Sequence, residues 1–196
     1  SVRSSCRTRV FPTDTPAGDD NLAPGLRDRL EQALGVAVNA ATLLPYALGV
    51  LASETFRAQA GEALKHDYPR VPVPREASAL FACAEAGKRL RAALCDRELG
   101  PSPLRVVGAA PSEIVSPAAG RLLPDAGRLT FGDASLEGVP SRAFSAQVGH
   151  WPVIERFLRS ELPVPLARVL DVVTRASMWA DALAYADVAF ADHASL

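Results

Sequence analysis

The hydrophobic pattern of the chain changes once, at Gly100-Pro101, and this change limits the folds that it can form. Before this point, apolar residues recur at steps of three and four, which is the spacing of amphipathic helices. After it, short apolar runs are separated by glycine and proline, as between short strands. Such segregation is typical of an α+β fold. We therefore predict a helical N-terminal half, a small antiparallel sheet in the middle and C-terminal helices. In domain terms, this gives a polar segment at 1–21, a helical subdomain at 22–100 and a mixed subdomain at 101–196.

Six segments have a helical pattern. They are 22–38, 39–51, 53–66, 76–99, 151–159 and 165–191. The second is apolar on nearly all sides, which predicts a buried helix with Pro45 in or near its first turn. Ser53 is a typical N-cap for the third helix, and Pro165 suits the first position of the last one. In the fourth helix the apolar stripe extends to Leu94, so this residue is expected to be buried.

Short strands are predicted in five places. They are Thr8–Phe11, Leu104–Val107, Glu113–Val115, Leu122–Leu123 and Arg128–Phe131. The segment 67–74 has prolines at alternating positions, which exclude a helix and favour extended backbone.

The composition excludes several classes of protein. The chain has 196 residues, of which 48% are apolar, so it can bury a core and is not expected to be disordered throughout. Its net charge of −1 excludes a uniformly basic surface for binding nucleic acid. No apolar run approaches the roughly 20 residues of a membrane helix. The polar N-terminus lacks the apolar region of a secretory signal, and three cysteines without a CxxC pair fit a reducing cytoplasm. Because the chain begins with Ser1 and its only methionine is Met178, we expect it to be processed or cut from something longer.

Motifs of common catalytic sites are missing from the sequence. It has no glycine-rich phosphate loop, no GxSxG elbow and no HExxH pattern, and its three histidines lack the spacing of metal ligands. We therefore predict no catalytic residue, no metal site and no cofactor.

Four features have both a structural and a functional interpretation. They are Cys83, Asp187, the pair Glu62–His66 and the pair His150-Trp151. For the thiol, we favour a core position over a nucleophile. For the aspartate, a hydrogen bond at a helix end is favoured over a functional buried acid. The Glu–His pair is expected to stabilise its helix rather than act as a general base. The His–Trp pair is expected to be a turn into a helix with a packed indole rather than a ligand platform.

Two groups of motifs resemble the region that follows the methyltransferase in type ISP and related single-chain restriction-modification enzymes. The first group is LPYALGVLASETFR at 44–57, LKHDYPRVPVP at 64–74 and LFACAEAGKRL at 80–90. The second is LEGVP at 136–140 and VGHWPVIERFLR at 148–159. Order and spacing agree, and the resemblance covers 22–191. The chain departs from the family pattern at His150, where glycine is usual, and at Phe157, where tryptophan is usual. The NPPY-type motif of the methyltransferase core is missing.

The resemblance implies a non-catalytic DNA target-recognition domain of a bacterial restriction-modification enzyme, cytoplasmic and active in phage defence. Its partners would be double-stranded DNA and a methyltransferase core, either upstream in the same polypeptide or in trans. Residues that match the motifs are expected to be scaffold. The proline segment, PRVPVP at 69–74, would dock one subdomain on another, and Gly149 to Arg159 would pack the C-terminal helices. Base-reading residues are expected within 104–142, where the available guanidinium groups are Arg105, Arg121, Arg128 and Arg142.

Five residues are predicted to contact DNA. They are Arg70, Arg75, Arg89, Arg105 and Arg128. An alternative is a protein-interaction or assembly module that has diverged from such a domain, which the thin basic charge and the apolar helix faces favour. A second alternative, a small enzyme, is disfavoured because catalytic motifs are missing.

Overall fold

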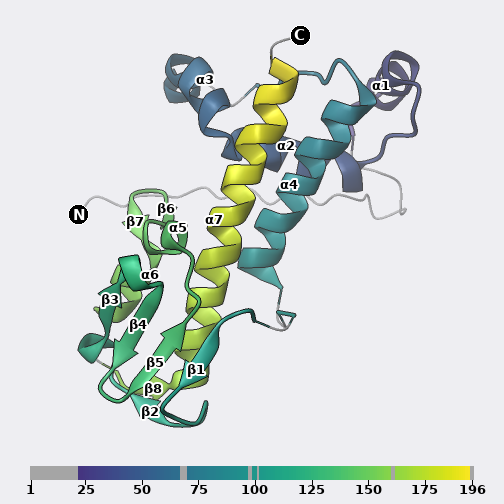
Figure 1. Ribbon diagram of the computed structural model, residues 1–196. Coiled ribbons are helices and arrows are strands. Elements are labelled where there is room, and N and C mark those ends of the chain that lie inside the picture. The colour runs from purple at the N-terminus through teal and green to yellow at the C-terminus, as the bar shows by residue number, and fades with distance from the viewer. Residues whose placement is uncertain (1–21, 67–69, 97–98, 101, 160–161, 195–196) are drawn as a thin grey trace, which may run out of the picture.

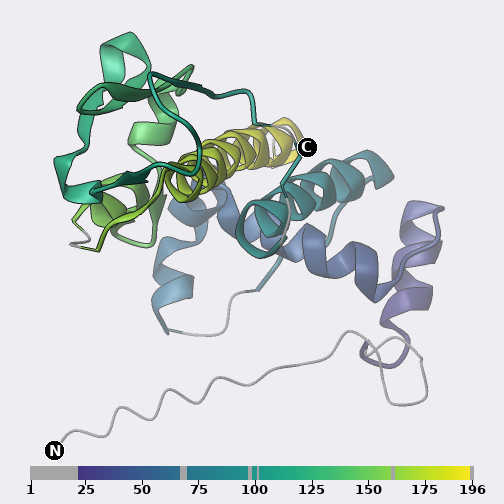
Figure 2. The ribbon, with the colours of Figure 1, turned by 90° about the horizontal axis from the view of Figure 1, so that it is seen from below.

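The computed structural model describes residues 22–66, 70–96, 99–100, 102–159 and 162–194. The N-terminal half is helical, with α1 (Leu26–Leu34), α2 (Ala40–Ala52), α3 (Glu54–His66) and α4 (Ala77–Cys95). The long helix α7 (Leu166–Ala194) lies beside α4 and runs in the opposite direction (Figures 1 and 2). The polar segment 1–21 and the strand predicted at Thr8–Phe11 lie outside the described residues.

The strands form one four-stranded sheet and two small two-stranded ones, all antiparallel within the described residues. The large sheet has the order β1 (Arg105–Val107), β5 (Ala134–Glu137), β4 (Arg128–Phe131), β3 (Arg121–Leu123). The smaller sheets pair β2 (Ile114–Val115) with β8 (Val164–Pro165), and β6 (Gln147–Val148) with β7 (Trp151–Pro152). Short helices α5 (Ser141–Phe144) and α6 (Val153–Leu158) complete this half, with 3-10 turns at 117–119 and 124–126. The predicted α+β class and order of elements are confirmed.

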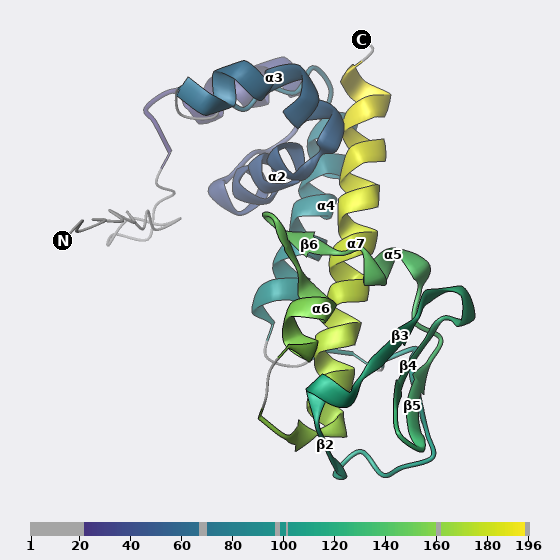
Figure 3. The ribbon, with the colours of Figure 1, turned by 90° about the vertical axis from the view of Figure 1, so that its left-hand side faces the viewer.

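Helix α7 contributes to both hydrophobic cores. Its N-terminal part packs with the sheet, α5 and α6 in a cluster that includes Val169 and Val173. Its C-terminal part adds Phe190 to a second cluster formed by α1 to α4. Figure 3 shows the large sheet beside the N-terminal half of α7 and β6 near the middle of that helix. The boundary predicted at residue 100 stays a prediction, and α7 connects what lies on either side of it.

Helices α2 and α4 cross with their backbones in contact. A Cβ atom added at Gly87 of α4 would lie 1.9 Å from the carbonyl oxygen of Pro45, and one at Gly49 of α2 would lie 2.0 Å from the carbonyl oxygen of Cys83. Only glycine allows so close an approach. Both glycines belong to the motifs that carry the family resemblance, which supports the view that these motifs encode scaffold.

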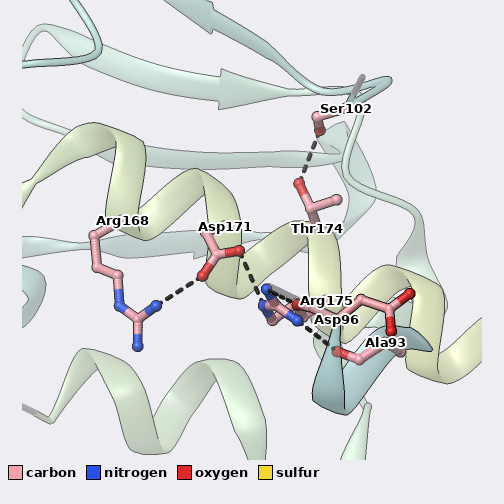
Figure 4. Close-up of polar contacts among 7 residues, drawn as sticks. All are labelled: Ala93, Asp96, Ser102, Arg168, Asp171, Thr174 and Arg175. Atoms are coloured by element: carbon pink, nitrogen blue, oxygen red, sulfur yellow. Dashed lines mark hydrogen bonds and ion pairs between the residues drawn. The ribbon is translucent and has the colours of Figure 1, made fainter. Parts of the chain in front are cut away.

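Arg175 of α7 fixes the chain where it passes from α4 toward the sheet (Figure 4). Its guanidinium donates to the carbonyl oxygens of Ala93 and Asp96, at 3.2 and 2.9 Å, near the C-terminal end of α4. These carbonyls have no partner within the helix, so a cation there satisfies them and interacts well with the helix dipole. Close by, the hydroxyl groups of Ser102 and Thr174 are hydrogen-bonded at 2.8 Å.

Asp187 of α7 joins the N-terminal end of α3. Its Oδ1 atom accepts hydrogen bonds from the backbone N–H of Thr55 at 2.8 Å and from the hydroxyl of Ser53 at 2.9 Å. The bond from the Thr55 backbone lowers the pKa of this carboxyl. Ser53 in turn accepts from the backbone N–H of Phe56, so it caps α3 as predicted. The structural interpretation of Asp187 is therefore the one that the contacts support.

Several predicted helix boundaries are wrong for identifiable reasons. The first helix spans 26–34 rather than 22–38, because Gly25 and Gly35 flank it with φ angles of 70° and 66°. The fourth ends at Cys95 rather than residue 99, and Leu94 near its end is 53% exposed instead of buried. In α2, Pro45 lies in the second turn.

Four further corrections concern the exposure of α2 and the elements of the C-terminal half. The apolar helix α2 is not buried on all sides, because Leu44 is 58% exposed. The helix predicted at 151–159 begins only at Val153, because Trp151 and Pro152 form a strand. Pro165 lies in β8, just before α7 begins. Strand β5 was not predicted.

Candidate nucleic-acid interface

A row of charged side chains crosses the large sheet. Strand register places Arg105 of β1 and Arg128 of β4 on either side of Glu137 of β5. Arg105 Nη2 donates to Glu137 Oε2 at 3.1 Å, and Arg128 Nη2 donates to Glu137 Oε1 at 2.7 Å. The two guanidinium groups are 77% and 44% exposed as side chains, whereas Glu137 is 23% exposed. One carboxylate therefore holds two solvent-facing cations in a defined arrangement.

The opposite face of the sheet is buried, and this determines which residues face solvent. Leu129 and Leu136 pair across β4 and β5 and are both fully buried against α7. Because side chains alternate along a strand, the neighbours of these leucines must point outward. The row of Arg105, Glu137 and Arg128 is thus fixed on the exposed face by the packing of the core.

Arg121 of β3 adds a third guanidinium to this exposed face. It pairs in register with Thr130, which shares the face of Arg128 two residues away. Its side chain makes no hydrogen bond or ion pair with any residue that the structure describes. We call the face formed by these three arginines and Glu137 the arginine face. Its charge is positive, although the chain as a whole is slightly negative.

The other predicted DNA contacts lie elsewhere. Arg89 on α4 is bonded to Glu85 at 3.0 Å, and its guanidinium carbon lies 4.1 Å from the ring centroid of Tyr185 on α7. Arg70 and Arg75 are exposed in the segment before α4. The structure thus brings Arg105 and Arg128 together but places the remaining three on the helical half.

Arg142, a predicted base-reading residue, forms an ion pair with Asp181 of α7. It lines a cleft of about 320 Å³ between α3, α5, β6 and α7, where Arg57 of α3 is a second lining residue. Arg57 ends the first family motif, so it was predicted to be scaffold and not a contact with DNA.

Residues 70–74 of the proline segment pack on the helices, and their docking of one subdomain on another stays a prediction. The hydroxyl of Tyr46 in α2 donates to the carbonyl oxygen of Pro72 at 2.8 Å, and Pro74 is buried. A cavity of about 200 Å³ lies behind this contact and is lined in part by Cys83. Burial raises the pKa of the Cys83 thiol to about 11. This thiol is 2% exposed in the helical core, where a core residue rather than a nucleophile was predicted.

The prediction of a packed indole at Trp151 is wrong, because the indole is 47% exposed. Gly149 and His150 form the two-residue turn of the β6–β7 hairpin rather than the start of a helix. The His150 ring lies 4.3 Å from the Trp151 ring, centroid to centroid, at an angle of 39°. The guanidinium carbon of Arg156 lies 4.1 Å from the centroid of the indole. The Glu62–His66 pair stays a prediction, because the side chain of His66 is outside what the structure describes.

Within the described ranges, no three histidine, cysteine or acidic side chains come together as metal ligands would. None of the helices in those ranges is long and apolar enough to span a membrane.

Comparisons with known proteins identify the family. The family model of the Type ISP C-terminal specificity domain matches residues 4–187. A chain in the solved structure titled "cryoEM structure DrdV-DNA complex" has the same fold, with a TM-score of 0.59 at 18% identity. The match covers 88% of this chain and 20% of that one, so the present chain spans about a fifth of the length of its structural neighbour. No curated protein is significantly similar. The resemblance inferred from the motifs is confirmed, and the chain belongs to the Type ISP C-terminal specificity domain family.

Proposed function

We propose that this specificity domain recognises duplex DNA for a restriction-modification enzyme and that the arginine face is part of its interface with DNA. The family match carries the functional class, and the solved structure with the same fold is a complex with DNA. The row of Arg105, Glu137 and Arg128 is the observation on this chain that best supports the location.

The arrangement on the sheet suits acceptor atoms on DNA. A guanidinium has five N–H donors, and the bonds to Glu137 use one from Arg105 and one from Arg128. The remaining donors can bind phosphate oxygens or the O6 and N7 atoms of guanine. Because Glu137 already orients both side chains, less conformational entropy is lost when DNA binds.

The other arginines that were predicted to contact DNA differ in the role that we propose for them. Arg70 and Arg75 are exposed and suit contacts with phosphates, which position DNA without reading its sequence. Arg89 is already engaged by Glu85 and Tyr185, so a contact from it would require an exchange of partners. Base-reading residues within 104–142 are proposed to include Arg121, whose side chain has no partner among the residues that the structure describes.

Catalysis is proposed to reside outside this chain. We propose that a methyltransferase core, upstream in the same polypeptide or in trans, supplies methyl transfer, and that the assembly acts against phage in the bacterial cytoplasm. The purified chain is expected neither to methylate nor to cleave DNA. Transfer of label from S-adenosylmethionine to DNA by this chain alone would contradict the proposal.

The test of DNA binding is fluorescence anisotropy with a labelled duplex at several salt concentrations. The double variant Arg105→Ala/Arg128→Ala removes two cations from the arginine face. The variant Arg29→Ala/Arg91→Ala removes the same charge from exposed positions on α1 and α4 and is the matched control. The affinity of wild type is expected to be micromolar or weaker at physiological salt, on the order of non-specific binding.

Each phosphate contact adds about 0.9 to the slope of log K against log salt. The salt slope of Arg105→Ala/Arg128→Ala should therefore be lower than that of wild type by up to about 1.8 if both arginines contact phosphates. The slope of the control variant should be nearly unchanged. Equal losses in the two variants would show that binding depends on charge in general and not on the arginine face. Failure of wild type to bind any duplex at low salt would refute the proposed function.

A protein-interaction module remains the second candidate, and one observation favours it. Leu44 and Leu48 lie one turn apart on α2 and are 58% and 38% exposed. Such a pair on a helix is typical of a surface that contacts another domain. Substitution of both leucines by serine should leave DNA binding unchanged if the first proposal holds.

A further inference from the structure

The β6–β7 hairpin carries two exposed aromatic residues, His150 and Trp151, at and beside its tip. Val148 of β6 pairs with Trp151 of β7, and Gly149 and His150 form the turn between them. Gly149 has a φ angle of 62°, as a two-residue hairpin loop with glycine at its first position requires. A Cβ atom added at Gly149 would have no other atom within 4 Å, so the turn is open on that side.

The base of the hairpin is firmly anchored. The indole Nε1 of Trp179 in α7 donates to the carbonyl oxygen of Gln147 at 2.8 Å. The backbone N–H of Val153 donates to the carbonyl oxygen of Ala146 at 2.9 Å, which closes the hairpin at its open end. Directly after β7, Ile154 of α6 is 1% exposed in the sheet core. The exposed rings therefore stand on a fixed support.

Arg156 is held differently from the arginines that pair with carboxylates. Arg105, Arg128 and Arg142 are each bonded to a carboxylate, whereas Arg156 lies over the face of the Trp151 ring. A cation–π contact orients a guanidinium without using any of its N–H donors. Among the described residues, no acceptor is hydrogen-bonded to the Arg156 side chain. All five of its donors are thus available in a partly fixed position.

Two chemical features of the tip point to a nucleobase as its ligand. An oriented guanidinium with unused donors matches the O6 and N7 acceptors of guanine. The exposed faces of the indole and imidazole rings can pack against bases or sugars, as aromatic side chains do in other nucleic-acid interfaces. A two-stranded ribbon is also narrow enough to enter the major groove, which is about 12 Å wide.

We propose that His150, Trp151 and Arg156 form a base-reading site on DNA, in which Trp151 positions Arg156 to bind the major-groove edge of a guanine. This inference rests on the proposed function, because it requires that the domain bind duplex DNA. The hairpin and the arginine face belong to different sheets, so the two contacts are tested by separate variants.

The first experiment follows tryptophan emission, since the chain has only two tryptophans. Duplex DNA at low salt should quench the emission of wild type, and the variant Trp151→Phe, which retains only Trp179, should lose most of this quenching. Anisotropy of a labelled duplex, measured in the same titration, reports binding itself. Binding without any change in the emission of Trp151 would overturn the inference while leaving the proposed function intact. Lack of binding by wild type would overturn both.

The second experiment identifies the contact. Wild type, Arg156→Gln and Arg159→Gln are each used to select duplexes from a pool with a randomised central segment. Arg159 is the matched control, because it lies in the same region, is 75% exposed and is 3.7 Å from Glu155 rather than over the indole. Wild type and the control should enrich guanine at the same position. Arg156→Gln should lose that preference by about tenfold or more, with the other positions unchanged.

Two results of the selection would overturn the inference. The first is weaker binding of Arg156→Gln to all sequences with a lower salt slope and an unchanged preference, which would make Arg156 a phosphate contact. The second is the lack of any preference for guanine in wild type. As a further check on positioning, Trp151→Ala should weaken the same preference even though it leaves Arg156 in place, because the guanidinium then loses its support.

Discussion

The crossing of α2 and α4 gives the sharpest prediction for stability. Gly87→Ala adds one methyl group in the middle of α4, where the new Cβ atom would lie 1.9 Å from the carbonyl oxygen of Pro45 and 2.6 Å from its carbonyl carbon. Cβ atoms essentially never come within 3.0 Å of other heavy atoms. Since both groups belong to helix backbones, no side chain can rotate away, and the helices must separate by more than about 1 Å.

Two effects of Gly87→Ala destabilise the protein, and one stabilises it. Overpacking of a core typically costs about 1–3 kcal/mol, and this contact is at the upper end because backbone must move. Separating the helices also weakens dispersion contacts along the interface, where a gap of 0.5–1 Å removes roughly a quarter to a half of each contact energy. Against this, alanine is favoured over glycine in a helix by about 1 kcal/mol. A net destabilisation of about 2 kcal/mol or more follows.

Thermal unfolding, followed by circular dichroism, measures the result. For a chain of this size, 1 kcal/mol corresponds to a change in Tm of roughly 2–4 °C, so Gly87→Ala should lower the Tm by about 4–8 °C or more. Gly61→Ala is the control, because Gly61 lies in α3 with no other atom within 4 Å of an added Cβ. This variant should raise the Tm slightly through helix propensity alone. If Gly87→Ala were as stable as Gly61→Ala, the close crossing of the two helices would be refuted.

Three other predictions concern charge and burial. Asp187→Asn should destabilise the protein by about 1 kcal/mol at neutral pH, because a neutral amide is a weaker acceptor for the N–H of Thr55. The pKa of Asp187 is lowered in the folded state. Its contribution to stability is therefore complete above the ordinary aspartate pKa of about 3.9 and is lost as pH falls through the lower folded value. The difference in Tm between variant and wild type should shrink in that acidic range and stay constant above it. Glu137→Gln should tighten non-specific binding to duplex DNA a few-fold, because a carboxylate that repels phosphates is removed. Weaker binding of this variant in an anisotropy titration would contradict the prediction and show that the orientation of the two arginines by Glu137 matters more. At pH 8 a thiol reagent should modify exposed Cys95 but not Cys83 in the folded protein, and mass mapping that finds both equally modified would contradict the buried position.

The sequence predicts the long helices well because their patterns extend over several turns. Helices α2, α3, α4 and α7 all occur where apolar residues recur with helical spacing, and burial of that face stabilises each of them. Their ends are less predictable, since an end depends on one or two residues. Gly35 ended a helix that its neighbours could have continued, because its backbone adopts a positive φ.

The sheet was predicted less completely because one central strand has no strand-like composition. Ala134–Glu137 contains alanine, serine and glutamate, which favour a strand only weakly, and it is stabilised by pairing with β1 and β4. The loop before it, Gly132-Asp133, and the loop Gly149-His150 both have glycine first with a positive φ. This pattern is a known signal for a two-residue hairpin and could have located both hairpins from the sequence.

The candidate site shows the same limit at the level of side chains. Arg105 and Arg128 were identified singly by residue type, but their shared contact with Glu137 depends on the register of β5, which the sequence pattern did not reveal. Likewise, Arg156 was placed in a predicted helix and in a family motif but not among the DNA contacts, because its contact with Trp151 exists only once the hairpin has formed. Contacts between strands and hairpins depend on pairing and not on local spacing, so they emerge only from the fold.

The first motif group and the arginine face occupy different places in the structure, whereas the three residues of the hairpin site belong to the second motif group. Gly49 and Gly87 lie where helices touch, and Tyr46 holds the proline segment, so the first motif group is explained by packing. The arginine face instead projects from a sheet whose buried side alone constrains the fold, so its outward positions can change without loss of stability. A domain that must read different sequences in different enzymes needs this separation, because its contacts with DNA can then vary while the packing that supports them is retained.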